Sequence, residues 1–267
     1  MDTVSIDPRT LYSRLGAAAS PLLLDVRRAP AFAADDRMIV AAQRCEDPGA
    51  FTRAFPPRPL VAYCVHGHEV SQEAARTLAM AGHEAAYLEG GIEAWREACL
   101  PTIRRRAEWN VPGGSRWITR ERPKIDRIAC PWLVRRFIDP GARFDYVAPE
   151  HVIEQAGVRG AVPYDVPGVQ VTHRGERCSF DALLEDFDLH DPALDLLATI
   201  VRGADTNRLD LAPQSAGLLA ASLGLSRQHA DDHAMLEQAM SLYDGLYAWC
   251  RDVSTGTRES HAWVPAQ

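Results

Sequence analysis

A single thiol stands at the end of an apolar run, where a loop and a helical pattern follow it. Residues 60–63 predict a buried strand, and Cys64 comes directly after them. Residues 71–81 have the composition of a helix, with Ser71 as the expected N-cap and Gly82 as its end. A cysteine there faces loop amides and a helix N-terminus, which favour an anion. The pattern predicts either a nucleophilic thiolate with a lowered pKa or a plain buried thiol, and spacing alone does not decide between them.

The neighbouring segments predict the elements that would position this thiol. Residues 22–27 form a second apolar run that carries Asp25 and Arg27 at its end, and residues 85–88 form a third. Short strands that alternate with helices up to about residue 100 predict a small α/β domain with a parallel sheet. Because ligands of such sheets bind at the carboxyl ends of the strands, Cys64 and Asp25 are expected to meet there.

The segment from Cys64 onward resembles the second half of a rhodanese domain. The resemblance rests on Cys64, the glycine three residues later, and the sequence Leu-Glu-Gly-Gly-Ile-Glu-Ala-Trp at residues 88–95. The sequence Asp-Val-Arg at residues 25–27 is similar to the signature of the first half. The resemblance implies that Cys64 carries a persulfide sulfur to a thiol acceptor without a cofactor. It also implies that Asp25 and Arg27 border the active-site loop, where they act in catalysis or form a salt bridge at the strand end.

The loop departs from the family pattern in length and charge. The expected substrate-binding loop consists of Val65, His66, Gly67, His68, Glu69, Val70 and Ser71. Its serine lies one residue later than usual, which resembles phosphatase-like and arsenate-reductase-like relatives, but Val70 replaces their arginine. Glu69 adds negative charge, and His66 and His68 would supply a cation only when protonated. Residues 36–42 replace a second family motif, Gly-His-Ile-x-Gly-Ala. Reduction of chromate or arsenate at Cys64 is therefore the least favoured interpretation.

The composition changes after residue 103. Residues 104–116 predict a linker, and residues 104–136 hold ten basic side chains against three acidic ones. This basic cluster predicts either an oxyanion or phosphate site or a set of ion pairs with the acidic C-terminal half. Mainly helical patterns with a few strands follow. The expected helices cover residues 124–138, 180–187, 192–201, 211–223 and 229–251, and the expected strands cover residues 117–120, 142–147 and 169–173.

Residues 117–133 resemble the opening of the C-terminal domain of the chromate-resistance protein B family. They read Trp-Ile-Thr-Arg-Glu-Arg-Pro-Lys-Ile-Asp-Arg-Ile-Ala-Cys-Pro-Trp-Leu, and residues 172–180, 200–205 and 230–233 extend the resemblance. It implies a role in chromate tolerance, as a sensor-regulator or an accessory cytosolic factor. The regulator branch needs a DNA-contacting N-terminal region, and a rhodanese-like domain takes that place here. Nucleic acid is therefore not an expected partner.

The same region predicts a first-row transition-metal site. The expected ligands are His173, Asp232, His233 and Glu237. His233 and Glu237 are four residues apart on a predicted helix, so both side chains lie on one face, where a loop histidine would complete the site. Two alternatives are that Cys130 and Cys178 supply thiolates, or that the helical pair is simply exposed.

Composition restricts the class of protein. The chain has 267 residues and a net charge of −7, which gives no general attraction to nucleic acid. It has no apolar run long enough for a bilayer and no secretion signal, so we expect a cytoplasmic protein without a membrane partner. Its six cysteines are scattered and form no CxxC pair, which fits a reducing compartment.

These patterns predict an α/β rhodanese-like domain with a parallel sheet, followed by a mainly helical domain with a few strands. The expected bounds are residues 1–103, a linker at 104–116, residues 117–255, and a tail at 256–267. The predicted function is a rhodanese-type sulfurtransferase linked to chromate resistance, with thiosulfate or chromate as its small-molecule partner. The alternative is a chromate-responsive sensor or oxyanion-binding protein with a degenerate rhodanese domain.

Overall fold

The apolar runs of the N-terminal half form one parallel sheet in the computed structural model, which describes residues 3–106 and 113–256. The strand order is β1-β6-β5-β2-β4, and every pairing is parallel. The strands are β1 (Val4–Ile6), β2 (Leu22–Asp25), β4 (Ala42–Arg44), β5 (Pro59–Tyr63) and β6 (Glu84–Leu88). The helices around them are α1 (Pro8–Ser13), α2 (Ala29–Ala33), α3 (Pro48–Ala54), α4 (Glu69–Met80) and α5 (Gly91–Glu97).

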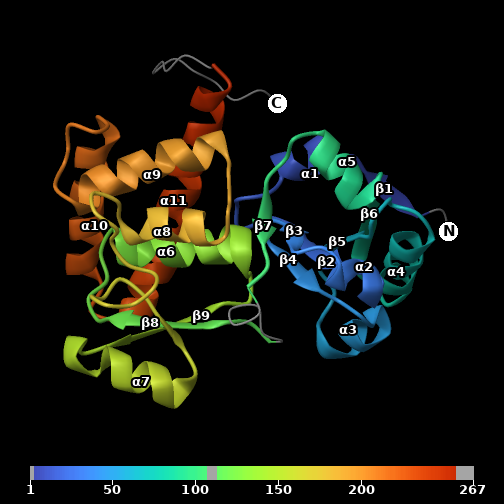
Figure 1. Ribbon diagram of the computed structural model, residues 1–267, viewed down its shortest axis with the longest axis horizontal. Coiled ribbons are helices and arrows are strands. Elements are labelled where there is room, and N and C mark those ends of the chain that lie inside the picture. The colour runs from blue at the N-terminus through green and yellow to red at the C-terminus, as the bar shows by residue number, and fades with distance from the viewer. Residues whose placement is uncertain (1–2, 107–112, 257–267) are drawn as a thin grey trace.

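Both faces of this sheet are buried, because alternate residues of a strand point to opposite sides. Leu22, Leu24 and Leu60 pack with Leu78 of α4 on one face. Leu23, Val61 and Tyr63 belong to the larger core on the other face, which also contains Leu11 of α1 and Trp95 of α5. The predicted α/β fold class is confirmed, and helices pack around this sheet (Figure 1). Cys64 and the loop after it join β5 to α4.

The C-terminal half forms a second lobe, in which helices pack on a small sheet (Figure 1). Its three parallel strands have the order β10-β8-β9. They are β8 (Arg116–Arg120), β9 (Arg143–Val147) and β10 (Val162–Pro163). The helices are α6 (Asp126–Leu133), α7 (Val152–Arg159), α8 (Ser179–Asp186), α9 (Pro192–Asp205), α10 (Gln214–Gln228) and α11 (Asp232–Ser254). A two-stranded antiparallel ribbon of β3 (Arg37–Ile39) and β7 (Thr102–Arg104) belongs to the N-terminal half. No helix among the described residues is long and apolar enough to cross a membrane.

Helix α6 continues through Pro131 and then widens into a π turn, Val134–Ile138. Proline has no N–H, so the carbonyl of Arg127, four residues earlier, loses its helical donor. The hydroxyl of Tyr164 donates to this oxygen at 3.2 Å. This hydrogen bond replaces the helical one that Pro131 cannot make, so the carbonyl of Arg127 has a partner although it lies in a buried helix.

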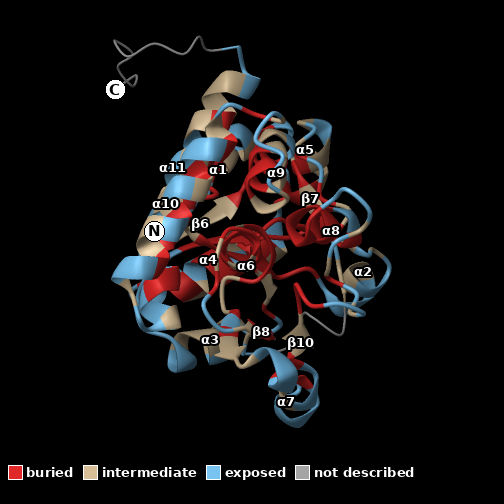
Figure 2. Ribbon diagram, turned by 90° about the vertical axis from the view of Figure 1, so that its left-hand side faces the viewer, coloured by how far each residue is buried: buried red, intermediate tan, exposed pale blue. Residues whose placement is uncertain are grey.

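The two lobes share one hydrophobic core. The cluster that contains Leu11 and Trp95 also contains Trp132, Phe137 and Tyr247 of the second lobe. Figure 2 shows α6 buried along its length at the centre of the molecule. Polar contacts join the lobes as well: the amide of Ala41 donates to Phe137 O at 2.6 Å, and the hydroxyls of Tyr12 and Tyr247 both contact Asp191. The two lobes are therefore packed together rather than tethered only by their linker.

Three local predictions are wrong. Helix α4 begins at Glu69 with His68 as N-cap, so Ser71 lies inside the first turn. Residues 169–173 form no strand, and within them only Val171 pairs, in an isolated parallel bridge with Tyr164. Helix α11 begins at Asp232 with Asp231 as its N-cap, three residues after the expected start at residue 229.

The predicted linker overlaps two strands at its ends. Arg104 ends β7 and Arg116 begins β8, whereas residues 107–112 between them lie outside the described residues. The predicted tail, residues 256–267, lies outside them except for Gly256. The domain bounds themselves stay a prediction.

Candidate active site

Cys64 lies immediately after β5, at the bottom of an open cleft of about 590 Å³. The cleft is lined by Arg27, Arg28, Ala31, Cys64, Val65, His66, His68, Glu69, Val70 and Gln72. The thiol is 6% exposed, and its Sγ atom lies 3.2 Å from the hydroxyl oxygen of Ser71. Ser71, which does not cap the helix, is instead the side chain that contacts the sulfur.

A cradle of main-chain amides surrounds this sulfur. Burial alone would raise the pKa of the Cys64 thiol, but the Ser71 hydroxyl and the amides of Ser71, His68 and His66 outweigh it. The pKa is therefore lowered, because these donors stabilise the thiolate more than the thiol. Gly67 gives the loop its sharp bend with φ +70°. The side-chain amide of Gln72 donates to the carbonyl of Gly67 at 3.1 Å.

Alkylation measures the effect of the cradle on Cys64 directly. In a Cys99→Ser background, which removes the exposed thiol, iodoacetamide should modify Cys64 before the four other buried cysteines. The rate should rise with pH through a midpoint below that of free N-acetylcysteine, because the thiolate forms at lower pH. Ser71→Ala should move this midpoint upward. Mass spectrometry of the Cys64 peptide follows the modification. A native midpoint at or above that of the free thiol would contradict a stabilised thiolate at Cys64.

The two glycines after β6 direct the following chain toward the backbone of the Cys64 loop. Gly90 and Gly91 have φ of +66° and +61°, so the chain turns back toward the loop. The amides of Ile92 and Glu93 then donate to the carbonyls of Cys64 (3.0 Å) and Val65 (3.2 Å). The segment at residues 88–95, which carries the family resemblance, thus anchors the backbone next to the thiol.

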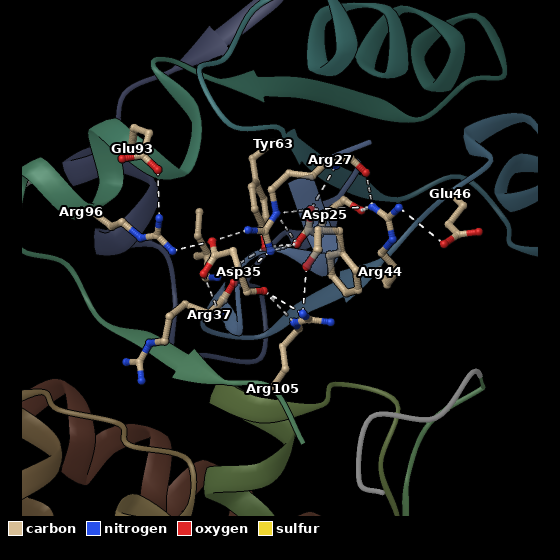
Figure 3. A network of polar contacts seen from close by, with 12 residues as sticks. Asp25, Arg27, Asp35, Arg37, Arg44, Glu46, Tyr63, Glu93, Arg96 and Arg105 are labelled. Carbon is tan, nitrogen blue, oxygen red and sulfur yellow. Dashed lines mark hydrogen bonds and ion pairs between the residues drawn. The ribbon is translucent and has the colours of Figure 1, made fainter. Parts of the chain in front are cut away.

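Asp25 and Arg27 form a buried ion network beside the cleft (Figure 3). The carboxylate of Asp25 is fully buried and accepts two side-chain hydrogen bonds from Arg27 Nε and one from Nη2, at 2.6–3.0 Å. Tyr63 OH donates to Asp25 at 3.0 Å, and Asp35 pairs with Arg27 at 2.6 Å. Arg44 donates to the carbonyls of Asp25 and Arg27. All these contacts fix the end of β2, which favours a positioning role for both residues over a direct catalytic one.

The predicted loop residues divide into two groups. Val65, His66, His68, Glu69 and Val70 line the cleft, whereas Gly67 and Ser71 shape the backbone and contact the thiol. Sequence reasoning missed Arg28, the N-cap residue of α2, whose exposed side chain also lines the cleft. Its position directly after the Asp-Val-Arg sequence is the signal that could have identified it.

The second lobe does not gather the four predicted metal ligands. Asp232 accepts from the amide of Arg122 at 3.0 Å, and Glu237 pairs with Arg135 at 2.6 Å. The ring of His233 packs edge-on against Tyr146. Within residues 3–106 and 113–256, the one group of three metal-ligating side chains is formed by Asp126, His173 and Asp205. The structure brings only His173 of the four predicted ligands into this group, because helical spacing fixes a shared face but not what packs against it.

The thiolate alternative for this lobe is also not supported. Cys130 and Cys178 are both fully buried. Burial first, and then the nearby charge of Asp126, raise the pKa of each thiol well above its usual value. Both cysteines are therefore held as neutral thiols in the core.

Two family models match the chain on either side of the linker. The model described as ChrB, C-terminal domain, matches residues 117–250, which is half of the chain. The chain belongs to the ChrB C-terminal domain family. The model described as rhodanese-like domain matches residues 7–98, so a rhodanese-like domain precedes the ChrB domain. Both resemblances expected from the sequence are thereby confirmed.

Individual relatives match one domain each. Protein ChrB from Cupriavidus metallidurans is 33% identical over 135 residues, which are 50% of this chain and 40% of that protein. Thiosulfate sulfurtransferase from Pseudomonas aeruginosa is 27% identical, with 39% of this chain and 20% of that chain covered and a TM-score of 0.33. The rhodanese-like domain of the Anabaena Alr3790 protein is also 27% identical, with 42% and 86% covered and a TM-score of 0.33.

The basic cluster at the start of the ChrB domain is largely neutralised by acidic partners that are distant in sequence. Arg104 contacts Asp188 at 3.1 Å, and Arg136 contacts Asp244 at 2.8 Å. Further ion pairs of this cluster are Arg104–Asp36, Arg106–Asp186, Arg116–Asp145, Arg120–Asp165, Arg127–Asp165 and Arg135–Glu237. Arg122 instead donates to main-chain carbonyls of residues 226–230. Of the two alternatives drawn from the sequence, the ion pairs describe these arginines, and an oxyanion site built from them loses its support.

Proposed function

We propose that this protein is a cytoplasmic rhodanese-type sulfurtransferase linked to chromate resistance, in which Cys64 carries the transferred sulfur as a persulfide. The observation that carries the proposal is the position of Cys64: a thiol with a lowered pKa, held by main-chain amides at the bottom of an open cleft. A nucleophile needs both a thiolate and access, and this position supplies both.

The proposed reaction has two transfers. The Cys64 thiolate attacks the outer sulfur of thiosulfate, a new S–S bond forms, and the old one breaks as sulfite leaves with the bonding electrons. The terminal persulfide sulfur carries the negative charge that the amides of His66, His68 and Ser71 are placed to stabilise. A thiolate acceptor then attacks this sulfur, and the Cys64 thiolate leaves. No cofactor enters either step.

Arg28 is the cation that the loop itself lacks. Its exposed side chain lines the cleft and has no ion-pair or hydrogen-bond partner in the part of the chain that the structure describes. A free guanidinium binds an anionic oxygen group well. Glu69 at the same cleft opposes this attraction, so we expect weak binding of small dianions.

Intact-mass spectrometry tests the proposal. Full-length protein treated with thiosulfate and desalted should gain the mass of one sulfur atom, and dithiothreitol should remove it. Cys64→Ser should show no gain, whereas the control Cys99→Ser should load like the native chain. Arg28→Ala should load only at higher thiosulfate. A native chain that never gains sulfur, or a Cys64→Ser variant that still does, rejects the proposal.

The link to chromate resistance comes from the second domain. That domain is similar to part of the Cupriavidus metallidurans ChrB protein, and the chain spans 40% of that protein's length. We propose that the shared domain directs sulfur transfer to the response to chromate. In cells that depend on this protein for chromate tolerance, Cys64→Ser should lose the tolerance that Cys99→Ser retains.

A further inference from the structure

We infer a binding site for a divalent first-row transition-metal ion in the ChrB domain, formed by Asp126, His173 and Asp205. Asp126 begins α6, Asp205 ends α9, and His173 lies in the loop before α8. One ligand atom of each lies within 4.8 Å of the others, although the residues are up to 79 positions apart (205 − 126). The site lies in the other lobe from Cys64, and sulfur transfer does not use it.

The spacing of the ligand atoms fits one ion. His173 Nε2 lies 3.0 Å from Asp205 Oδ2 and 3.7 Å from Asp126 Oδ2, and Asp165 Oδ1 is a fourth oxygen at 3.5 Å. With metal–ligand bonds of about 2.1 Å, neighbouring ligand atoms are separated by about 3.0 Å in octahedral and about 3.4 Å in tetrahedral coordination. The observed separations span this range, so small side-chain shifts would close the site around a cation.

The charge of the group is unbalanced. Asp126 is fully buried, yet within the described residues the one ion-pair partner of Asp126 and of Asp205 is His173. The arginines nearby, Arg120 and Arg127, pair with Asp165 instead. Asp25 is just as buried and is matched by Arg27. A buried carboxylate and a half-buried one that share a single imidazole as their ion-pair partner can accept further positive charge, and a divalent ion supplies it.

Neighbouring groups hold the ligands in place and leave coordination capacity. The amides of Ser179 and Phe180, at the start of α8, donate to the two oxygens of Asp126 at 2.6 and 2.9 Å. The hydroxyl of Ser179 donates to Asp165 at 3.0 Å. Each carboxylate oxygen has two lone pairs, so these bonds orient it without saturating it.

The open side of the site lies at His173. Its side chain is 40% exposed, whereas that of Asp126 is not exposed at all, so an ion and its water ligands have one route of entry. One imidazole nitrogen with two or three carboxylate oxygens is a ligand set that suits Mn²⁺, Fe²⁺ or Zn²⁺. The neutral thiol of Cys130, 3.6 Å from Asp126, donates to that carboxylate and is not a ligand.

Mn²⁺ titration of the full-length apo protein, followed by electron paramagnetic resonance, tests the inference. The six-line signal of free Mn²⁺ should stay suppressed until one equivalent is bound. Asp205→Asn keeps the shape of the side chain and removes a repelling charge, so it should fold normally and yet weaken binding by about 100-fold or more. His173→Ala should do the same. His151→Ala is the matched control, because His151 also lies beside a carboxylate, Glu154 at 3.7 Å, but beside only one.

Two results overturn the site. One is an undiminished free-ion signal at millimolar Mn²⁺, together with no Zn²⁺ or Fe²⁺ retained after dialysis by elemental mass spectrometry. The other is metal binding that Asp205→Asn and His173→Ala leave unchanged. In the first case the group is an internal histidine–carboxylate cluster, and in the second the ion sits elsewhere. Circular dichroism melts of the apo variants show that any lost binding is not lost folding.

Discussion

Gly91→Ala is expected to destabilise the protein by roughly 2–5 kcal/mol and to displace the loop that holds Cys64. Gly91 has φ +61°, a conformation that L-residues rarely adopt. A Cβ atom there would lie 2.4 Å from Cys64 O and 2.5 Å from Val65 O. Both are main-chain atoms, so no side chain can rotate away to relieve the clash. The cradle itself must move, and the pKa of Cys64 should rise.

The same substitution at Gly157 is the control. Gly157 lies inside α7, and an added Cβ there would meet nothing within 4 Å. Alanine favours a helix over glycine, so Gly157→Ala should stabilise the protein by about 0.5–1 kcal/mol. Urea denaturation gives the unfolding free energies, and iodoacetamide kinetics give the state of Cys64. Equal denaturation midpoints for Gly91→Ala and the native chain would show that the turn is not the support described above.

Asp25→Ala should cost about 3–5 kcal/mol of unfolding free energy, because it removes the fully buried one of the two carboxylates that balance the charge of Arg27. The side chain of Arg27 is 1% exposed and would keep only Asp35 and the carbonyl of Arg37 as partners, and the hydroxyl of Tyr63 would lose its acceptor. Water cannot replace these contacts at the end of β2. We expect the native sheet to loosen where Cys64 and Asp25 leave it.

A second aspartate–arginine pair with the same sequence separation provides the comparison. Asp210 pairs with Arg208 at 3.1 Å, but both side chains are largely exposed. Asp210→Ala should leave the denaturation midpoint nearly unchanged, because solvent screens such pairs. Sulfur loading separates positioning from catalysis: if Asp25→Ala were as stable as the native chain and still failed to load, Asp25 would act in the reaction itself.

Local patterns predicted the elements around Cys64 well. Apolar runs bounded by turn residues gave β2, β5 and β6, and Gly82 marked the end of α4 correctly. Asp7 caps α1, and Pro8 stands in the first turn of that helix. These features depend on neighbours within a few residues, so the chain order contains the necessary information.

The start of α4 was misplaced for a physical reason. Ser71 is a good capping residue, but the helix begins two residues earlier, at Glu69. The bend at Gly67 and the hydrogen bonds from the segment after Gly90 set the path of the loop. The hydroxyl of Ser71 therefore contacts the thiol of Cys64 and does not cap the helix.

The sequence by itself determined that a thiol follows a strand of a parallel sheet, and that a second, mainly helical domain follows. Only the tertiary structure decided where the charges go. The arginines of the basic cluster meet acids from distant elements, as Arg136 meets Asp244, and His173 meets Asp126 and Asp205 rather than His233. Charge pairing and ligand geometry depend on distances between elements far apart in the chain. Those distances are set by packing of the shared core, which no local spacing encodes.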